Sequence, residues 1–450
     1  MIEREAPISR ALVIHPAARE GMARAEARLE EASGLAEALD LEVAEAFILP
    51  VRKIDAGRYF GRGKLDELKA QISENQADVA VIDAALSPIQ QRNLENAWKV
   101  KVIDRTGLIL EIFGQRARTK EGVLQVELAR LAYERSRLVR TWTHLERQRG
   151  GRGFLAGPGE TQIETDRRLL NEKMAKLHRQ LEDVRRTRSL HRAKRQDVPF
   201  PTVALVGYTN AGKSTLFNRM TGAAVFAQDM PFATLDPTVR AVDLPGGTRI
   251  LLSDTVGFIT DLPTELIAAF RATLEEVREA DLLVHVIDAA DPDHEGRIQD
   301  VLNVLDAIEA GPAHEQPMIE AWNKADNLDL EGAEELAIRS DVANMKAGRA
   351  VKMPLSAASG DGVDGLIDAI ETALARDDER IEVHVPPEQP RALAWLHEHG
   401  EIRESETDPE TGGTTVRVRL APAEAGRFRA QFPDLAIPLG IGESEDGDDW

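Results

Sequence analysis

The stretch 207–214 reads GYTNAGKS and fits the pattern G-x-x-x-x-G-K-[ST]. It follows the apolar run TVALV at 202–206, which predicts a buried strand, and it precedes LFNRM at 216–220, which predicts a helix. In that setting the glycines let the backbone wrap closely around phosphate groups, and the start of the helix adds its dipole. The stretch therefore predicts a P-loop that binds a nucleoside triphosphate on an α/β sheet.

Each polar side chain of this loop has an expected role. Lys213 reaches the β- and γ-phosphates, and the hydroxyl of Ser214 binds Mg²⁺. For Asn210 two interpretations stay open: it helps to bind a monovalent cation, K⁺, near the phosphates, or it merely satisfies the turn. The residues expected to surround the phosphates are Gly207, Tyr208, Thr209, Asn210, Ala211, Gly212, Lys213, Ser214 and Thr215.

Two further motifs complete the expected phosphate and metal site. Asp254 ends the strand-like run RILLSD and is placed to organise Mg²⁺, while the N–H of Gly257 can sense the γ-phosphate. The run RILLSD is the second strand of a predicted hairpin, VRAVDLPGGTRILLSD at 239–254. In the loop between the P-loop helix and this hairpin, Thr234 is the candidate for a second hydroxyl on Mg²⁺, with Thr238 as the alternative. The expected catalytic residues are Lys213, Asp254, Gly257 and Thr234. The two motifs comprise Phe232, Ala233, Thr234, Leu235 and Asp236, and then Asp254, Thr255, Val256 and Gly257.

The choice of base rests on a motif at the end of the strand-like run PMIEAW. It consists of Asn323, Lys324, Ala325 and Asp326. An aspartate there can accept hydrogen bonds from both N1–H and the 2-amino group of guanine, and a site built around such a pairing can discriminate by about 10⁴. Ser356, Ala357 and Ala358 follow VKMPL and are placed to contact guanine O6. The sequence thus predicts GTP as the substrate.

The residue after the D-x-x-G glycine is Phe258. Many GTPases carry a glutamine there, which orients the attacking water. A phenyl ring cannot polarise water, so we expect slow hydrolysis by the chain alone. A partner, another residue or a bound ion must then complete the site.

The 450 residues are too many for one ordinary domain. We expect a small α/β domain over 1–115, with strands at ALVIHP, ADVAVIDA and KVKVIDR and a helix from Pro88 to about Trp98. A helical hairpin over 116–197 follows, with helices at 122–147 and 165–195 around a non-helical, Gly-rich tip, packed through Leu177, Leu181 and Val184. A GTPase domain over 198–378 is predicted to be a doubly wound, mostly parallel sheet. A small C-terminal α+β unit with an acidic tail occupies 379–450.

The charge of the chain is unevenly distributed. Its net charge is −21, yet residues 130–195 hold 18 Lys and Arg against 8 Asp and Glu. This run is either a solvated helix face or a surface for RNA phosphates. On the second interpretation the contact residues would be Arg149, Arg152, Phe154, Arg167 and Arg168. The chain has no cysteine, no signal-like N-terminus and no apolar run long enough for a bilayer, so we expect a cytoplasmic protein with no membrane partner.

Four runs of sequence resemble the HflX family of ribosome-associated GTPases: GGRGFLAGPGETQIETDRR at 150–168, GYTNAGKSTLFNRMTG at 207–222, FATLDPT at 232–238, and DTVGFITDLPTELIAAFRATLEE at 254–276. GRGKLDEL at 61–68 adds to the likeness. The resemblance implies binding to the large ribosomal subunit and its rRNA, with splitting or rescue of stalled ribosomes under stress. It also implies that the hairpin loop approaches the peptidyl-transferase region and that an apolar residue at Phe258 is usual. The acidic tail lies outside the pattern that we recognise.

Two hypotheses of function remain open. The first is a GTPase that acts on the ribosome, as a monomer in solution. The second is a GTP-dependent switch for a protein partner, with the basic hairpin serving as a dimerising coiled coil, which regular a/d heptads would favour. An ATP-dependent kinase is a distant third because Asp326 disfavours adenine.

Overall fold

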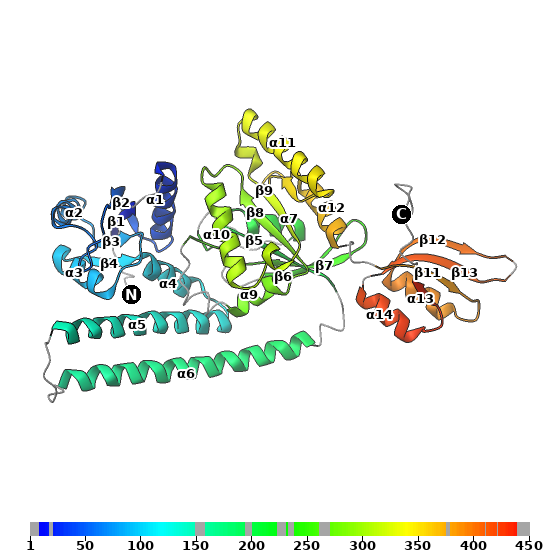
Figure 1. The fold of residues 1–450 in the computed structure, drawn as a ribbon, viewed down its shortest axis with the longest axis horizontal. Helices are drawn as coiled ribbons and strands as arrows, with labels where there is room; N and C mark the ends of the chain where they lie inside the picture. Colours follow the sequence, from blue (N-terminus) through cyan, green and yellow to red (C-terminus); the bar gives the residue numbers. More distant parts are fainter. Residues whose placement is uncertain are drawn as a thin grey trace, which may run out of the picture.

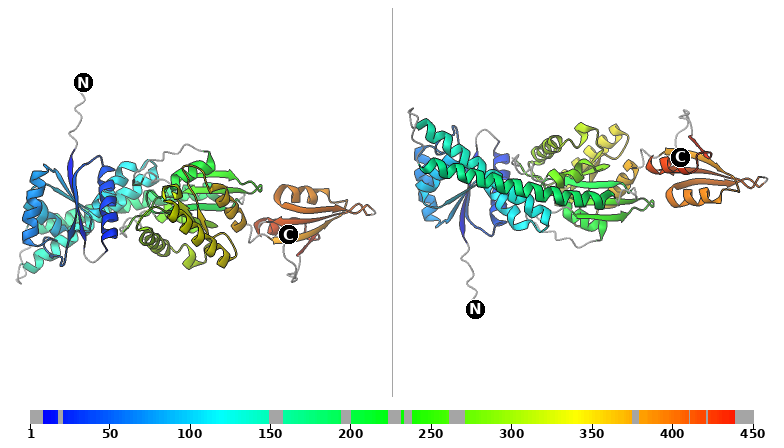
Figure 2. Two further views of the ribbon diagram at one scale, coloured as in Figure 1. Left: turned by 90° about the horizontal axis from the view of Figure 1, so that it is seen from above. Right: turned by 90° about the horizontal axis from the view of Figure 1, so that it is seen from below.

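The computed structural model describes residues 9–17, 21–148, 158–193, 200–222, 231–232, 238–260, 271–374, 379–409, 411–420 and 422–438. Within these ranges the chain forms three sheets, which follow one another along the long axis of the molecule (Figure 1). A pair of long helices runs alongside the first two sheets, as the right view of Figure 2 also shows. The third sheet lies apart from these helices, at the end of the molecule opposite the first sheet (Figure 1).

The N-terminal sheet is fully parallel in the order β2-β1-β3-β4. Alternate strand residues face opposite sides, so α1 and α4 cover one face, through Leu35 and Phe113, and α2 and α3 the other, through Leu68 and Leu94. The elements are β1 (Arg10–Ala17), α1 (Met22–Glu37), β2 (Glu42–Pro50), α2 (Arg62–Glu74), β3 (Val79–Ile82), α3 (Pro88–Trp98), β4 (Lys101–Asp104) and α4 (Arg105–Arg116).

Helix α3 begins and ends where the sequence predicted. The side chain of Ser87 accepts a hydrogen bond from the backbone of Gln90, the Gln90 side chain accepts one from the N–H of Ser87, and Pro88 occupies the first helical position. Strand β2 was not predicted. Its residues are mostly half-buried because it lies at the edge of the sheet, so its pattern lacks the continuous apolar run of β1.

The helical hairpin consists of α5 (Lys120–Gln148) and α6 (Pro158–Ala193). Leu177, Leu181 and Val184 pack against apolar residues of α5, among them Leu128, as predicted. The predicted start of the second helix at 165 was wrong. Helix α6 starts at Pro158, because a proline is tolerated in the first turn, where its missing N–H would have no helical partner.

The sheet of the GTPase region has the order β10-β9-β8-β5-β7-β6, parallel except for the β6–β7 hairpin. This confirms the predicted doubly wound α/β class. The elements are β5 (Thr202–Gly207), α7 (Lys213–Thr221), β6 (Thr238–Asp243), β7 (Arg249–Asp254), α9 (Arg271–Arg278), β8 (Leu282–Asp288), α10 (His294–Ala307), β9 (Met318–Asn323), α11 (Leu330–Ala347), β10 (Lys352–Pro354) and α12 (Val363–Leu374). Two short 3-10 turns, η1 (Pro312–His314) and η2 (Ala325–Asn327), flank β9.

The C-terminal unit is an antiparallel sheet in the order β12-β13-β11-β14 with two helices. It has its own apolar cluster, centred on Val383, Val416 and Phe428. The predicted acidic tail at 441–450 lies outside the described residues. The elements are β11 (Glu379–Val385), α13 (Pro390–His399), β12 (Glu401–Thr407), β13 (Thr414–Leu420), α14 (Pro422–Gln431) and β14 (Ala436–Pro438).

The N-terminal domain and the GTPase region share one apolar core. A single cluster contains Leu35 and Phe113 from the first together with Phe232 and Phe258 from the second. The rings of Phe113 and Phe232 meet edge to face, with centroids 4.5 Å apart. In the part of the chain that the structure describes, no helix has the length and apolar character needed to cross a membrane.

Candidate nucleotide-binding site

The P-loop connects β5 to α7 and depends on two glycines. Gly207 and Gly212 have φ angles of +150° and +91°, which disfavour other residues. A Cβ on Gly207 would collide with the carbonyl oxygen of Val286, and one on Gly212 would collide with the side-chain amide of Asn323. The loop is therefore packed directly against strands β8 and β9.

Lys213 is the first residue of α7, and its side chain folds back over the loop. Its Nζ donates hydrogen bonds to the carbonyl oxygens of Gly207 at 3.1 Å and Tyr208 at 2.7 Å. Burial lowers the pKa of Lys213 to about 8, although the carboxylate of Asp254 acts in the opposite direction. An ammonium group buried so deeply gains from an anionic partner, which a phosphate group would supply.

The expected metal ligands lie next to each other. Ser214 Oγ donates a hydrogen bond to Asp254 Oδ2 at 2.7 Å. Asp254 is fully buried at the end of β7, and Thr255 anchors the next turn by donating to the carbonyl oxygen of Leu205 at 2.6 Å. A hydroxyl beside a carboxylate is an oxygen-only donor pair of the kind that Mg²⁺ prefers. Thr238, the alternative metal ligand, starts β6 opposite Asp254, contrary to the expectation that it lies in the preceding loop.

The D-x-x-G segment lies against the P-loop. A Cβ on Gly257 would approach Lys213 Nζ to 3.0 Å and Thr209 Cα to 2.9 Å, so only a glycine fits without displacing a neighbour. The next residue, Phe258, donates its N–H to the carbonyl of Gly207 at 3.0 Å and accepts from the N–H of Thr209 at 2.8 Å. Its ring is 2% exposed and belongs to the shared core.

Asn323 ties together two loops that the sequence assigns to the nucleotide. Its Nδ2 donates to the carbonyl of Ala211 in the P-loop at 2.8 Å, and its Oδ1 accepts from the N–H of Ala357 at 2.8 Å. The side chain is buried, so its role here is to hold the loops together. Lys324 follows with φ +61° and pairs with Asp288 at 2.7 Å.

The carboxylate proposed to read the base remains accessible. Asp326 lies in η2 and is exposed, as is Ala358, whereas Ser356 is buried. A residue that the sequence did not reveal supports this region. Arg219 on α7 donates from Nε to the carbonyl of Ala357 at 2.8 Å, and a second donor meets the carbonyl of Ala358. Arg219 lies about two turns after the P-loop, and no sequence pattern around it indicated a contact with residues so far along the chain.

The structure also places other predicted residues of the P-loop and of α6. Tyr208, Thr209 and Ala211 are buried, while Asn210 is exposed with φ +62°, a conformation that asparagine tolerates in turns. Arg167 and Arg168 are exposed on α6, and Arg168 lies 3.7 Å from Glu172. The predictions for Ala233, Thr234, Leu235, Asp236, Arg149, Arg152 and Phe154 lie outside the described residues.

Comparison with known proteins fixes the family. The chain is 51% identical over 406 residues to the GTPase HflX of Magnetococcus marinus, which covers 90% of each chain. It is 45% identical over 408 residues to the GTPase HflX of Escherichia coli K12, covering 90% of this chain and 93% of that one. The chain belongs to the HflX family of GTPases.

Family models match most of this HflX chain. They are described as GTP-binding GTPase N-terminal (residues 26–114), GTP-binding GTPase Middle Region (116–195), 50S ribosome-binding GTPase (202–324) and HflX C-terminal domain (341–450). The chain is thus a P-loop protein that binds and hydrolyses GTP, as predicted. The last match extends to residue 450, so the acidic end lies within it, contrary to the expectation from the sequence.

Solved structures of GTP-binding proteins also resemble the HflX chain. A GTP-binding protein of Sulfolobus solfataricus in complex with GDP is 25% identical, with a TM-score of 0.41, and the match covers 81% of this chain and 98% of that one. The FeoB G-domain of Methanococcus jannaschii is 26% identical, with a TM-score of 0.28, and the match covers 39% of this chain and 98% of that one.

Proposed function

We propose that GTP binds at the site built from Gly207–Ser214, Asp254–Gly257, Asn323–Asp326 and Ser356–Ala358. Lys213 pairs with the β- and γ-phosphates, and the Gly257 N–H meets the γ-phosphate. Asp326 accepts from guanine N1–H and the 2-amino group, and the N–H of Ala358 donates to O6. The adjacency of Ser214, Asp254 and Lys213 in one buried corner supports this assignment.

Mg²⁺ is the metal that fits this corner. Ser214 would ligate it directly, Asp254 would orient its shell, and Thr234 would supply a second hydroxyl. When bound, the ion neutralises charge on the phosphates. We also propose that K⁺ binds through the side-chain oxygen of Asn210, which is an exposed residue of the P-loop. Hydrolysis should then run faster in potassium than in sodium salts.

We infer that the partner is the large ribosomal subunit and its rRNA, and that the protein splits or rescues stalled ribosomes under stress in the cytoplasm. The observation that carries this is the match of 202–324 to a family described as a 50S ribosome-binding GTPase. The basic hairpin supports it, because Arg167 and Arg168 are exposed on α6 and phosphate contacts need accessible cations.

The alternative, a switch for a protein partner that dimerises through the hairpin, has less support. A coiled-coil dimer needs an apolar seam that faces a second chain. Here Leu124, Leu128 and Leu131 of α5 pack against Met174, Leu177 and Leu181 of α6 within the same chain. We therefore propose a monomer, organised as the domains 1–115, 116–197, 198–378 and 379–450.

Cosedimentation with ribosomal subunits tests the proposed partner. The full chain is mixed with large and small subunits, with a non-hydrolysable GTP analogue or with GDP. We expect it to pellet with large subunits in the analogue and to stay in the supernatant with GDP. Equal recovery with and without subunits would reject the ribosome as partner.

A loop replacement tests the hairpin tip. Residues 150–159 are replaced by a short Gly-Ser linker. The linker variant should bind GTP normally but lose stimulation of hydrolysis by large subunits. If stimulation persists over a range of salt, the tip is only a connector.

A further inference from the structure

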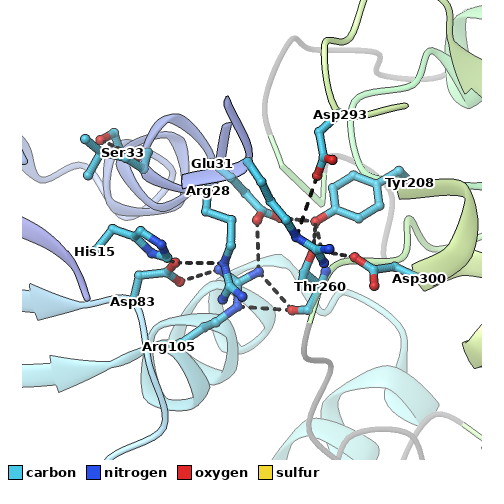
Figure 3. Close-up of polar contacts among 12 residues, drawn as sticks. His15, Arg28, Glu31, Ser33, Asp83, Arg105, Tyr208, Thr260, Asp293 and Asp300 are labelled. Atoms are coloured by element: carbon cyan, nitrogen blue, oxygen red, sulfur yellow. Dashed lines mark hydrogen bonds and ion pairs between the residues drawn. The ribbon is translucent and has the colours of Figure 1, made fainter. Parts of the chain in front are cut away.

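The P-loop and the D-x-x-G segment are both joined to the N-terminal domain by a buried polar network (Figure 3). Tyr208 is the second residue of the P-loop, and Thr260 lies three residues after Gly257. Both face Glu31 on α1 and Arg105 at the start of α4. Neither Glu31 nor Arg105 belongs to a nucleotide motif.

Arg105 reaches across the domain boundary with its whole guanidinium group. Its Nε and Nη2 donate to the carbonyl oxygen of Thr260 at 3.1 and 2.9 Å. The same group pairs with Asp83 at 2.5 Å and with Glu31 at 3.0 Å, and it is 3% exposed. Burial would lower the pKa of Arg105, but Glu31 and Asp83 outweigh it and raise the pKa, so the group stays charged.

Tyr208 closes the network from the P-loop side. Its hydroxyl donates to Glu31 Oε1 at 2.6 Å and accepts from the N–H of Thr260 at 2.8 Å. Thr260 Oγ1 lies 2.6 Å from the same hydroxyl and donates to Asp300 on α10 at 2.7 Å. Burial and the nearby Glu31 both raise the pKa of Tyr208, which keeps the phenol protonated as a donor.

These contacts hold segment 257–260 at two points. Phe258 is bonded through its backbone to Gly207 and Thr209 of the P-loop, and Thr260 is bonded to Arg105 and Tyr208. We propose that Arg105 and Glu31, acting through Thr260 and Tyr208, are positioning residues of the GTPase site: they fix segment 257–260 so that Gly257 meets the γ-phosphate. This rests on the role proposed above for Gly257.

Loss of this network should weaken the binding of GTP but not the binding of GDP. A segment already fixed at Phe258 and Thr260 loses little conformational entropy when the N–H of Gly257 binds a phosphate, whereas a segment released at Thr260 must be ordered by the ligand. GTP would bear that cost because it carries the γ-phosphate. GDP lacks that phosphate, so its affinity is independent of where Gly257 lies.

The test compares two affinities in the full-length protein with Mg²⁺: that for GDP and that for the slowly hydrolysed analogue GTPγS. Arg105→Lys keeps the positive charge beside Asp83 but cannot make the two-pronged bond to the Thr260 carbonyl. Glu31→Gln and Tyr208→Phe are conservative in shape and serve if Arg105→Lys does not fold. In each we expect the GTPγS affinity to fall about tenfold and the GDP affinity to change less than about twofold.

Two further measurements separate positioning from a merely structural role. Arg137→Lys is the matched control, since Arg137 pairs with Asp104 at 2.7 Å within the N-terminal half and should leave both affinities unchanged. Glu31→Gln combined with Tyr208→Phe should cost less affinity than the sum of the two single variants, because both alter the 2.6 Å contact between these side chains.

The proposal is overturned if both nucleotides weaken together, if neither changes, or if GTPγS binds more tightly. The last result would mean that the network restrains the segment away from the phosphate. The nucleotide site itself is tested separately by Lys213→Ala, which should lose both nucleotides. Retention of both by that variant would reject the site assignment, whatever the Arg105 variants do.

Discussion

The side-chain amide of Asn323 donates to the carbonyl of Ala211, so the strand that leads to the base-recognition residues is fastened to the phosphate loop. The Oδ1 of the same side chain accepts a hydrogen bond from the N–H of Ala357, which holds the loop of Ser356–Ala358 against the same strand. One buried amide thus sets the distance between the phosphate and base ends of the proposed site.

Asn323→Ala should weaken GDP and GTPγS alike, by about tenfold or more, because the Ala211 carbonyl and the Ala357 N–H both lose their partner. Fluorescent-nucleotide titration measures this. Asn344→Ala is the control, because its amide similarly joins α11 to Val351 and Lys352, and these bonds involve neither loop. The control should lower thermal stability without changing affinity. Unchanged nucleotide binding in Asn323→Ala would contradict the proposed role.

Asp326→Asn should exchange the base preference. The amide presents a donor to the N1–H of guanine, so GTP affinity should fall at least about 100-fold, the value of two hydrogen bonds to a charged group. Xanthine carries an oxygen in place of the 2-amino group, and xanthosine triphosphate should gain affinity. Competition assays with both nucleotides decide this. Equal competition by ATP and GTP at the unmodified protein would show that the motif does not select guanine.

Nucleotide affinity should fall as the pH rises through about 8. Burial lowers the pKa of Lys213 to that value, so the side chain is charged below it and neutral above it. The phosphates bind the charged form, and so affinity is highest below about pH 8. Lys213→Arg keeps its charge throughout and should show a flatter profile between about pH 7 and 9. Parallel profiles for the two proteins would place the titrating group elsewhere, for example on guanine.

Phe258→Gln should not raise the basal rate of GTP hydrolysis. The side chain at this position is buried in the shared core, and its backbone is fixed to Gly207 and Thr209, so a glutamine there would not reach the γ-phosphate. A buried amide without partners costs about 1–3 kcal/mol, and the melting temperature should drop. Single-turnover hydrolysis and thermal melting measure the two effects. A clear gain in rate would show that the segment reorients during the reaction.

The sequence predicted best those features that depend on residues close to one another in the chain. The strand, loop and helix of the P-loop, the helix from Pro88 to Trp98 and the packing of Leu177 and Leu181 are local patterns, and the structure has them as predicted. Strand β2 was missed because an edge strand is only half-buried and has a weak pattern. The start of α6 at Pro158 was missed because the glycines and the proline around it disfavour a helix by composition alone.

The roles of several site residues could not be predicted for a different reason. Asn323 was expected near the base, yet it bonds to Ala211, which lies 112 residues away in sequence. Arg105 meets Thr260 across 155 residues, and Arg219 meets Ala357 across 138. No spacing rule relates such residues, since the fold alone brings them together. From a single sequence, a chemical role can be assigned only to a motif with a fixed local geometry.

Because Phe113 and Leu35 share a core with Phe232 and Phe258, we expect the N-terminal domain and the GTPase region to unfold as one cooperative unit. On heating, the N-terminal domain and the GTPase region should melt in a single calorimetric transition, since neither part can open without exposing the apolar surface of the other. The C-terminal unit, with its separate cluster, should melt independently. A GTPase region expressed alone would present that apolar surface to water and tend to aggregate. We therefore expect that the GTPase region cannot be transferred to another protein without the N-terminal domain that covers its apolar surface.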